Sequence, residues 1–79
     1  MKNIELYKSC FTASLSISDD GLEDLEYNSV PEWDSIGHMT LISGLEEGFG
    51  ISIETDDIID FSSFNKGKEI LQKYKIEIE

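Results

Sequence analysis

The chain has 79 residues, with 17 Asp and Glu against six Lys and Arg, giving a formal net charge of −11. A chain this short forms one domain, residues 1–79, because two smaller pieces would bury too little apolar surface to fold. The negative charge argues against a nucleic-acid partner, and no apolar run approaches the roughly 20 residues that insert into a membrane, so we expect a cytoplasmic protein.

The first predicted element is a helix that begins at Asn3. Its apolar residues recur at helical spacing, with two further residues widening the stripe: Ile4, Leu6, Tyr7, Cys10, Phe11 and Leu15. Cys10 is the only cysteine, so no internal disulfide forms, and we expect its thiol to fill core space. We expect no metal site, because zinc would need more Cys or His and the acidic residues near Gly21 lack calcium-loop spacing.

Residues 16–34, SISDDGLEDLEYNSVPEWD, form the next segment. Ser, Asp, Gly, Asn and the only proline interrupt the helical period, which predicts a long loop. Four apolar residues make it unlike a disordered linker: Leu22, Leu25, Val30 and Trp33. We therefore expect an ordered loop pinned to the domain, with a short extra helical turn as the alternative. Long loops in small domains often position functional residues.

A second helix is predicted from Ser35, and Gly50 is placed to end it in a left-handed conformation. Its expected core-facing stripe steps by three or four residues: Ile36, Met39, Ile42, Leu45 and Phe49. Glu46 and Glu47 lie off that stripe. The mid-chain glycines Gly44 and Gly48, together with Gly67 further on, indicate a marginally stable bundle, since a helical glycine costs about 1 kcal/mol relative to alanine.

The remaining residues predict an extended link over residues 51–57, a short helix capped by Thr55 that ends at Asp60, and a final helix capped by Ser62 or Ser63. The final helix carries Phe64, Ile70, Leu71 and Tyr74. The tail, residues 75–79, alternates like a strand but lacks a visible partner, so we expect it to be frayed or loosely packed. The predicted fold is all-α, a small four-helix bundle of three longer helices and one short helix.

The start of the second helix carries a candidate functional serine. Asp34 is a preferred N-cap residue whose carboxylate can accept the N–H of Ile36 or Gly37, which leaves Ser35 at the first helical position, facing solvent. Trp33 is placed to pack over His38 as a hydrophobic staple. Backbone N–H groups at a helix start also favour an anion, so a phosphodiester on Ser35 would be well placed.

Two other interpretations of this serine compete with a phosphodiester site. Asp followed by Ser is a common capping arrangement, which requires no chemistry at all. Asp34, Ser35 and His38 also supply the residue types of a hydrolytic triad, but they crowd within five residues, and Trp33 occupies the first glycine position of a Gly-x-Ser-x-Gly elbow. We therefore predict no enzyme activity, and expect His38 to face solvent or a partner.

The segment DSIGHMTLISGLEEGFGI, followed by ETDDIIDF and SSFNKGKEILQKY, resembles the discrete acyl carrier proteins over most of the chain. The resemblance implies a covalent 4'-phosphopantetheine, transferred from coenzyme A to Ser35 by a phosphopantetheinyl transferase. Asp34 matches the acid that assists this transfer, and Ile36 matches the leucine after the serine. The arm would hold an acyl group as a thioester for an acyl-loading ligase and for acyltransferase or synthase enzymes.

The same resemblance implies a partner-binding surface. The expected residues are Trp33, Gly37, His38, Met39, Glu46, Glu47, Asp56 and Asp57. Because the sequence does not indicate an obligate interface, we expect a monomer. Gly37 and Thr40 stand where housekeeping carriers typically have acids, and the Trp-Asp-Ser-x-Gly-His-Met form is similar to carriers of dedicated biosynthetic pathways. Met39, Ile42 and Phe61 line either an acyl groove or simply the core, and we favour the core.

Two alternatives to an acyl carrier stay open. An aminoacyl or peptidyl carrier would share every residue named above and differ only in its cargo. An unmodified interaction module would keep the carrier fold and bind a basic protein partner through the acidic surface. In that module Ser35 would serve only as a residue at the helix start.

Overall fold

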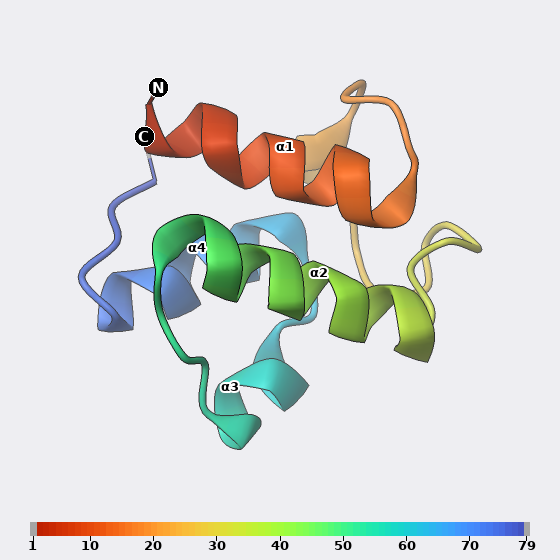
Figure 1. The fold of residues 1–79 in the computed structure, drawn as a ribbon. Coiled ribbons are helices and arrows are strands. Elements are labelled where there is room, and N and C mark those ends of the chain that lie inside the picture. Colours follow the sequence, from red (N-terminus) through yellow and green to blue (C-terminus); the bar gives the residue numbers. More distant parts are fainter. Residues whose placement is uncertain (1, 79) are drawn as a thin grey trace.

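The computed structural model describes residues 2–78, which form four α-helices joined by loops (Figure 1). The helices are α1 (Asn3–Leu15), α2 (Ser35–Phe49), α3 (Thr55–Asp60) and α4 (Phe64–Lys73), and a 3-10 turn, η1 (Leu22–Asp24), lies in the first loop. Residues 2–78 form no β-strand, but they contain one isolated antiparallel β-bridge, between Glu26 and Ser63. The predicted all-α bundle of three longer helices and one short helix is confirmed.

Helices α1 and α2 run antiparallel beside each other (Figure 1). The predicted stripe of α1 is confirmed, because Tyr7, Cys10, Phe11 and Leu15 are all buried. The Cys10 thiol fills core space as expected and donates to the carbonyl of Gly44 on α2, 3.7 Å away; burial raises its pKa. None of the helices within residues 2–78 combines the length and the apolar character that crossing a membrane requires.

The core is centred on aromatic rings from α1, the first loop, the segment that joins α3 to α4 and the start of α4. Phe11 of α1 packs against Tyr7 at 5.1 Å, Phe64 at 5.1 Å, Trp33 at 5.5 Å and Phe61 at 6.2 Å between ring centroids. Such ring pairs favour edge-to-face or tilted contacts over flat stacking, as these do. This cluster joins α1, the first loop and both ends of the α3–α4 connection around one centre.

The first loop is ordered because its apolar residues are buried and its backbone is tied to α4. Leu22 and Leu25 lie in the core. The Phe64 N–H donates to the Leu25 carbonyl and the Tyr27 N–H to the Ser62 carbonyl, both at 2.9 Å. The ordered loop is therefore confirmed, and η1 shows that the alternative of an extra helical turn also holds.

The predicted stripe of α2 is wrong in its first two turns. Ile36 is 80% exposed and Met39 is 50% exposed, whereas Leu41, Ile42 and Leu45 form the buried face. From Ile36 to Leu45 the helix makes about two and a half turns, so the steps of three residues place Ile36 on the side opposite the buried Leu45. The predicted end of α2 is confirmed, since Gly50 adopts the left-handed conformation at φ 66°.

The boundaries of the last two helices were partly predicted. Ser63 caps α4 as expected, accepting a hydrogen bond from the Lys66 N–H at 2.9 Å. The proposed cap of α3 is wrong, because Glu54 takes the N-cap position without a side-chain hydrogen bond and Thr55 is already helical. The extended link is correspondingly shorter than predicted.

Gly67 has a packing role that its sequence position did not reveal. A methyl group at this position would overlap the Tyr7 hydroxyl and the Phe61 ring. The glycine therefore lets α4 approach α1 and the α3–α4 connection closely. Gly67 is therefore not simply a weak point of the bundle, as the sequence suggested. The close packing around it leaves no room for a side chain.

Residues 75–78 of the tail after α4 are packed rather than frayed, and Glu79 lies outside the described residues. The Ile76 N–H donates to the Leu71 carbonyl at 3.0 Å, and the Asn3 side-chain amide donates to the Glu77 carbonyl at 2.9 Å. Ile76 and Ile78 are half-buried against the core. The two ends of the described chain consequently lie side by side (Figure 1).

Candidate functional site

The start of α2 is built by Asp34 as an N-cap. Asp34 is extended, at φ −103° and ψ −167°, and its Oδ1 accepts a hydrogen bond of 2.9 Å from the Gly37 N–H. This bond satisfies one of the free N–H groups of the first helical turn. The predicted cap is confirmed. Of the two predicted donors, Ile36 and Gly37, the Gly37 N–H makes the hydrogen bond.

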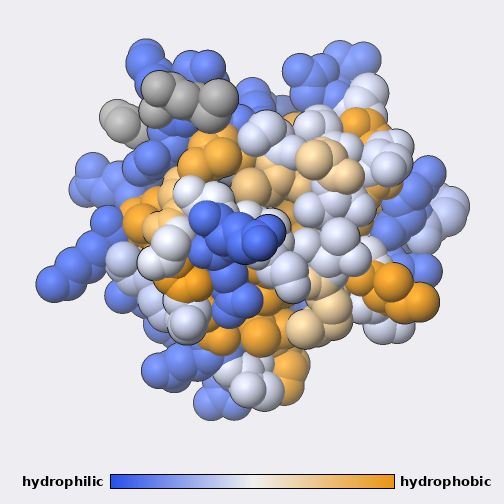
Figure 2. Space-filling view, in the orientation of Figure 1, coloured by the Kyte–Doolittle hydropathy of each residue, from blue (hydrophilic) through white to orange (hydrophobic). Residues whose placement is uncertain are grey.

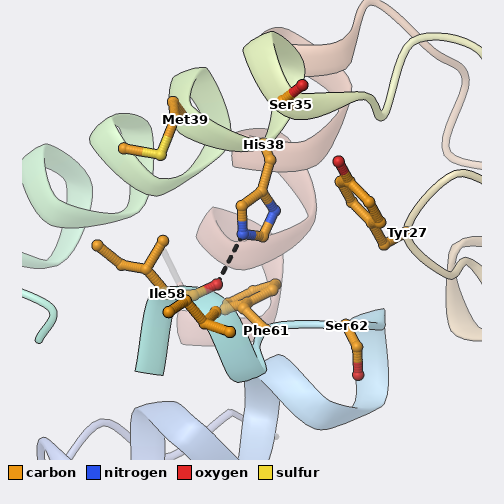
Figure 3. Close-up of a pocket in the computed structure, with 8 residues that line it drawn as sticks. Tyr27, Ser35, His38, Met39, Ile58, Phe61 and Ser62 are labelled. Atoms are coloured by element: carbon orange, nitrogen blue, oxygen red, sulfur yellow. Dashed lines mark hydrogen bonds between the residues drawn. The ribbon is translucent and has the colours of Figure 1, made fainter. Parts of the chain in front are cut away.

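Ser35 follows as the first residue of α2 and is exposed, as predicted. Its hydroxyl points away from the His38 ring, out of the first turn (Figure 3). Its neighbour Ile36 is 80% exposed. An exposed hydroxyl beside free backbone N–H groups has both the access and the local dipole that an esterified phosphate would need.

Gly37 was expected to contact partners, but its main constraint is internal. A side chain here would overlap the carbonyl oxygen of Glu32, and its Cβ would lie 3.1 Å from a methyl of Leu15. Because Gly37 has no side chain, the first loop can pass close to the first turn of α2. This contact holds the residues just before Ser35 in place.

Trp33 packs against His38 as predicted, but both side chains are more buried than expected. The rings are nearly parallel, 6.1 Å between centroids and 20° between planes, and the Trp33 Nε1–H donates to His38 Nδ1 at 2.9 Å. Trp33 is 0% exposed, so its predicted role in partner contact is wrong. The reason is that it sits among Phe11, Phe61 and Tyr27.

His38 does not point freely to solvent or a partner. It is half-buried, and its Nε2 lies 2.8 Å from the carbonyl oxygen of Ile58 on α3 (Figure 3). Both ring nitrogens are thus engaged, one with Trp33 and one with Ile58. The histidine connects the residue before the N-cap to α3.

A pocket of about 350 Å³ opens between α2, α3 and the first loop, next to Ser35. Its lining is mainly apolar and comprises Tyr27, Ser35, His38, Met39, Ile58, Ile59, Phe61 and Ser62. Of the three groove residues named from sequence, Met39 and Phe61 line this pocket, but Phe61, like Ile42, is 1% exposed and belongs to the core. Met39 therefore lines the groove, Ile42 belongs to the core, and Phe61 belongs to both.

Sequence reasoning missed several of these pocket residues. Tyr27 and Ile59 are exposed at 38% and 73%, and Ile58 contributes the carbonyl bound by His38. One signal was available, because adjacent isoleucines on a six-residue helix cannot both face the core. The position of Tyr27 required the tertiary structure, since it depends on how the first loop folds back.

The four acidic residues expected to meet partners lie in different environments. Glu47 and Asp56 are exposed. Glu46 is half-buried, and its Oε2 accepts a 2.8 Å hydrogen bond from the Ile53 N–H. Glu46 therefore fixes the turn after α2 rather than standing free.

The prediction that Asp57 contacts partners is wrong, because this residue is only 4% exposed. Its carboxylate accepts hydrogen bonds from Lys73 at 2.5 Å and from the Tyr74 hydroxyl at 2.6 Å. These two bonds hold its pKa below the usual range despite the opposing effect of burial. Asp57 therefore ties α3 to the end of α4 and is not available as a docking residue.

The surface around the pocket combines apolar and acidic side chains. Figure 2 shows hydrophobic residues interspersed with hydrophilic ones over α2 and α3, including a hydrophilic group near the middle of this face. The exposed apolar residues there are Ile36, Met39 and Ile59. Within residues 2–78, no three His, Cys, Asp or Glu side chains are grouped as metal ligands would be.

Comparisons with known proteins leave the chain without an assigned relative. No family model matches it, and neither the curated proteins nor the solved structures contain a significant match.

Proposed function

We propose that the chain is an acyl carrier protein, modified at Ser35 with 4'-phosphopantetheine from coenzyme A by a phosphopantetheinyl transferase. The observation that carries this proposal is the exposed Ser35 hydroxyl on the first turn of α2, directly after the capping Asp34. The Asp-Ser motif resembles the attachment site of acyl carriers, and its position at the start of α2 leaves the Ser35 hydroxyl accessible to a transferase. The arm would contribute a thiol that holds an acyl group as a thioester.

The residues around Ser35 fit an attachment point better than a catalytic centre. A hydrolase would need a base within reach of the serine. The one histidine of the chain instead binds Trp33 and Ile58 through its two nitrogens. A carrier needs only an exposed oxygen held on a rigid element, because its partner enzymes perform the chemistry.

The surface supports recruitment of such partners. The net charge of −11 favours enzymes with basic patches. Exposed Glu47 and Asp56, with Ile36, Met39 and Ile59 nearer the serine, provide both acidic and apolar contacts. The proposed partners are an acyl-loading ligase and an acyltransferase or synthase of a dedicated pathway.

The pocket beside Ser35 supports a cargo with an apolar part. Its lining by Met39, Ile58, Ile59 and Phe61 would shield an apolar group from water. An aminoacyl group would gain less from this lining than an acyl chain. The pocket therefore favours an acyl carrier over an aminoacyl carrier.

The test is coexpression of the full chain with a broad-specificity phosphopantetheinyl transferase, followed by intact-mass measurement. We expect the mass of one phosphopantetheine group to be added to the wild type and to Ser43→Ala, which alters another exposed serine of α2. Ser35→Ala should gain nothing. A folded wild type that stays unmodified with active transferases from several sources would favour the unmodified interaction module.

A further inference from the structure

The hydrogen bonds of His38 determine where its ring proton lies. An indole nitrogen only donates, so His38 Nδ1, 2.9 Å from Trp33 Nε1, must accept. A carbonyl oxygen only accepts, so Nε2, 2.8 Å from the Ile58 oxygen, must donate. The arrangement therefore requires a neutral imidazole that carries its proton on Nε2.

A second ring proton is incompatible with this arrangement. A proton on Nδ1 would face the Trp33 N–H, leaving two donors and no acceptor between them. Trp33 is 0% exposed, so its N–H cannot turn to water instead. Its indole is also held between Phe11 and Phe61, at 5.5 and 6.3 Å between ring centroids. The half-buried imidazole, which borders the pocket, is the ring that is free to move.

Movement of the imidazole would release α3. The Ile58 carbonyl otherwise accepts only a long backbone bond of 3.4 Å, from the Phe61 N–H. The bond from His38 is thus the shorter of its two hydrogen bonds, and it joins α2 to the end of a six-residue helix. A helix this short has little stability of its own and depends on such contacts.

The groups around the imidazole offer no compensation for a positive charge. Tyr27 from the first loop meets the ring edge-to-face at 5.4 Å, and Phe61 from the α3–α4 connection lies at 6.0 Å. The nearby carboxylates point elsewhere: Asp34 of α2 accepts from the Gly37 N–H, and Asp57 of α3 accepts from Lys73 and Tyr74. Within residues 2–78, no acidic side chain forms an ion pair with this histidine.

From this geometry we propose that His38 is a proton-sensitive clamp. In its neutral form it joins the buried Trp33 to α3 and keeps the pocket beside Ser35 narrow. In its protonated form it leaves Trp33, releases the Ile58 carbonyl and lets α3 move away from α2. Histidine is suited to such a change because its ring can hold either one or two protons.

The chain is well suited to a direct test, because it contains one histidine and one tryptophan. NMR on the full, unmodified protein would follow the ring nitrogens of His38, the indole N–H of Trp33 and the amide protection factors of α3 from pH 8 to pH 5. At pH 8 we expect the proton on Nε2. As His38 becomes protonated, the indole signal should shift and the protection of the Ile58 and Phe61 amides should fall about tenfold.

The matched variant is His38→Gln, because a glutamine side chain offers one acceptor and one donor but does not titrate. Its α3 protection should stay nearly constant between pH 8 and pH 5. It also controls for Asp57, whose release from Lys73 requires a lower pH because its pKa is lowered. A second variant, Trp33→Phe, removes the opposing donor, and its α3 protection should respond less to pH.

Two results on the wild type alone would overturn the clamp. One is a His38 proton on Nδ1 at pH 8. The other is a protonated His38 that leaves the Trp33 indole signal and the α3 protection unchanged. Neither measurement involves modification of Ser35, so the clamp can fail while the carrier proposal stands, and the reverse also holds.

Discussion

The hydroxyl of Tyr7 on α1 donates a 2.6 Å hydrogen bond to the main-chain carbonyl of Phe64, the first residue of α4. The two residues are 57 positions apart, and their rings also pack at 4.8 Å between centroids. Burial, with a smaller effect of Cys10, raises the pKa of Tyr7. The hydroxyl therefore keeps its proton, and this link between the first and last helices persists over the ordinary pH range.

Tyr7→Phe should lower the free energy of unfolding by about 1–2 kcal/mol, because a buried hydrogen bond is lost while the ring packing is kept. Urea denaturation followed by circular dichroism would measure the change. Tyr27→Phe is the control at an exposed position and should change the value by less than about 0.5 kcal/mol. Equal effects of the two substitutions would contradict the proposed role of Tyr7.

Gly67→Ala should destabilise the protein by about 1–3 kcal/mol, although alanine is the better helix former. The added methyl overlaps the Tyr7 hydroxyl and the Phe61 ring, so one of the packed elements must shift. Gly48→Ala is the matched control, because its new Cβ meets Leu6 and Cys10 only at ordinary distances of 3.5 Å and more. That variant should be as stable as the wild type or more stable, and the opposite order in urea unfolding would show the packing argument to be wrong.

Asp57→Asn should change how stability depends on pH. The pKa of Asp57 is lowered first by the hydrogen bond from Lys73, then by that from Tyr74, and the pKa of Lys73 is raised mainly by its bond to Asp57. The carboxylate thus adds stability above its usual pKa of about 3.9, which is lost as pH falls through the lowered value. The ammonium adds stability below its usual pKa of about 10.4, which is lost as pH rises through the raised value.

The measurement for this pair is the urea midpoint between pH 2 and pH 11, taken at constant ionic strength. The Asp57→Asn variant should lose most stability relative to wild type in the central range and converge with it at the acidic end. Asp56→Asn, at the exposed neighbouring residue, should track the wild type throughout. A uniform loss for Asp57→Asn down to pH 2 would indicate that packing rather than charge explains the effect.

Substitutions of Asp34 separate its capping role from its proposed role in modification. Asn is also a good N-cap residue, so Asp34→Asn should keep stability within about 0.5 kcal/mol, whereas Asp34→Ala should lose about 1 kcal/mol. If the carboxylate assists the transferase, both variants should be modified at Ser35 more slowly than wild type. Modification of Asp34→Asn at the wild-type rate, measured by intact mass over time, would leave Asp34 with only its structural role.

The sequence predicted those features that depend on local chemistry. Asp34 and Ser63 cap helices because their side chains reach N–H groups three residues ahead, and Gly50 ends α2 because its backbone conformation suits glycine. The exposed position of Ser35 follows from the same cap. The stripe of α1 was predictable because one face of that helix is covered along its whole length.

Other features were decided by contacts between distant segments. Asp57 belongs to an acidic run but is buried, because Lys73 and Tyr74 reach it from α4. The packing role of Gly67 depends on Tyr7, which lies 60 residues earlier in the chain.

The sequence by itself therefore determined the helices, the caps at Asp34, Gly50 and Ser63, and the serine at the start of α2, because these depend on residues within one or two turns of each other. Only the tertiary structure decided which carboxylate is buried and what His38 binds. Those outcomes depend on which surfaces meet when the helices pack, and spacing along the chain does not encode that directly. The pocket beside Ser35 arises in the same way, from a loop, two helices and a connection brought together by folding.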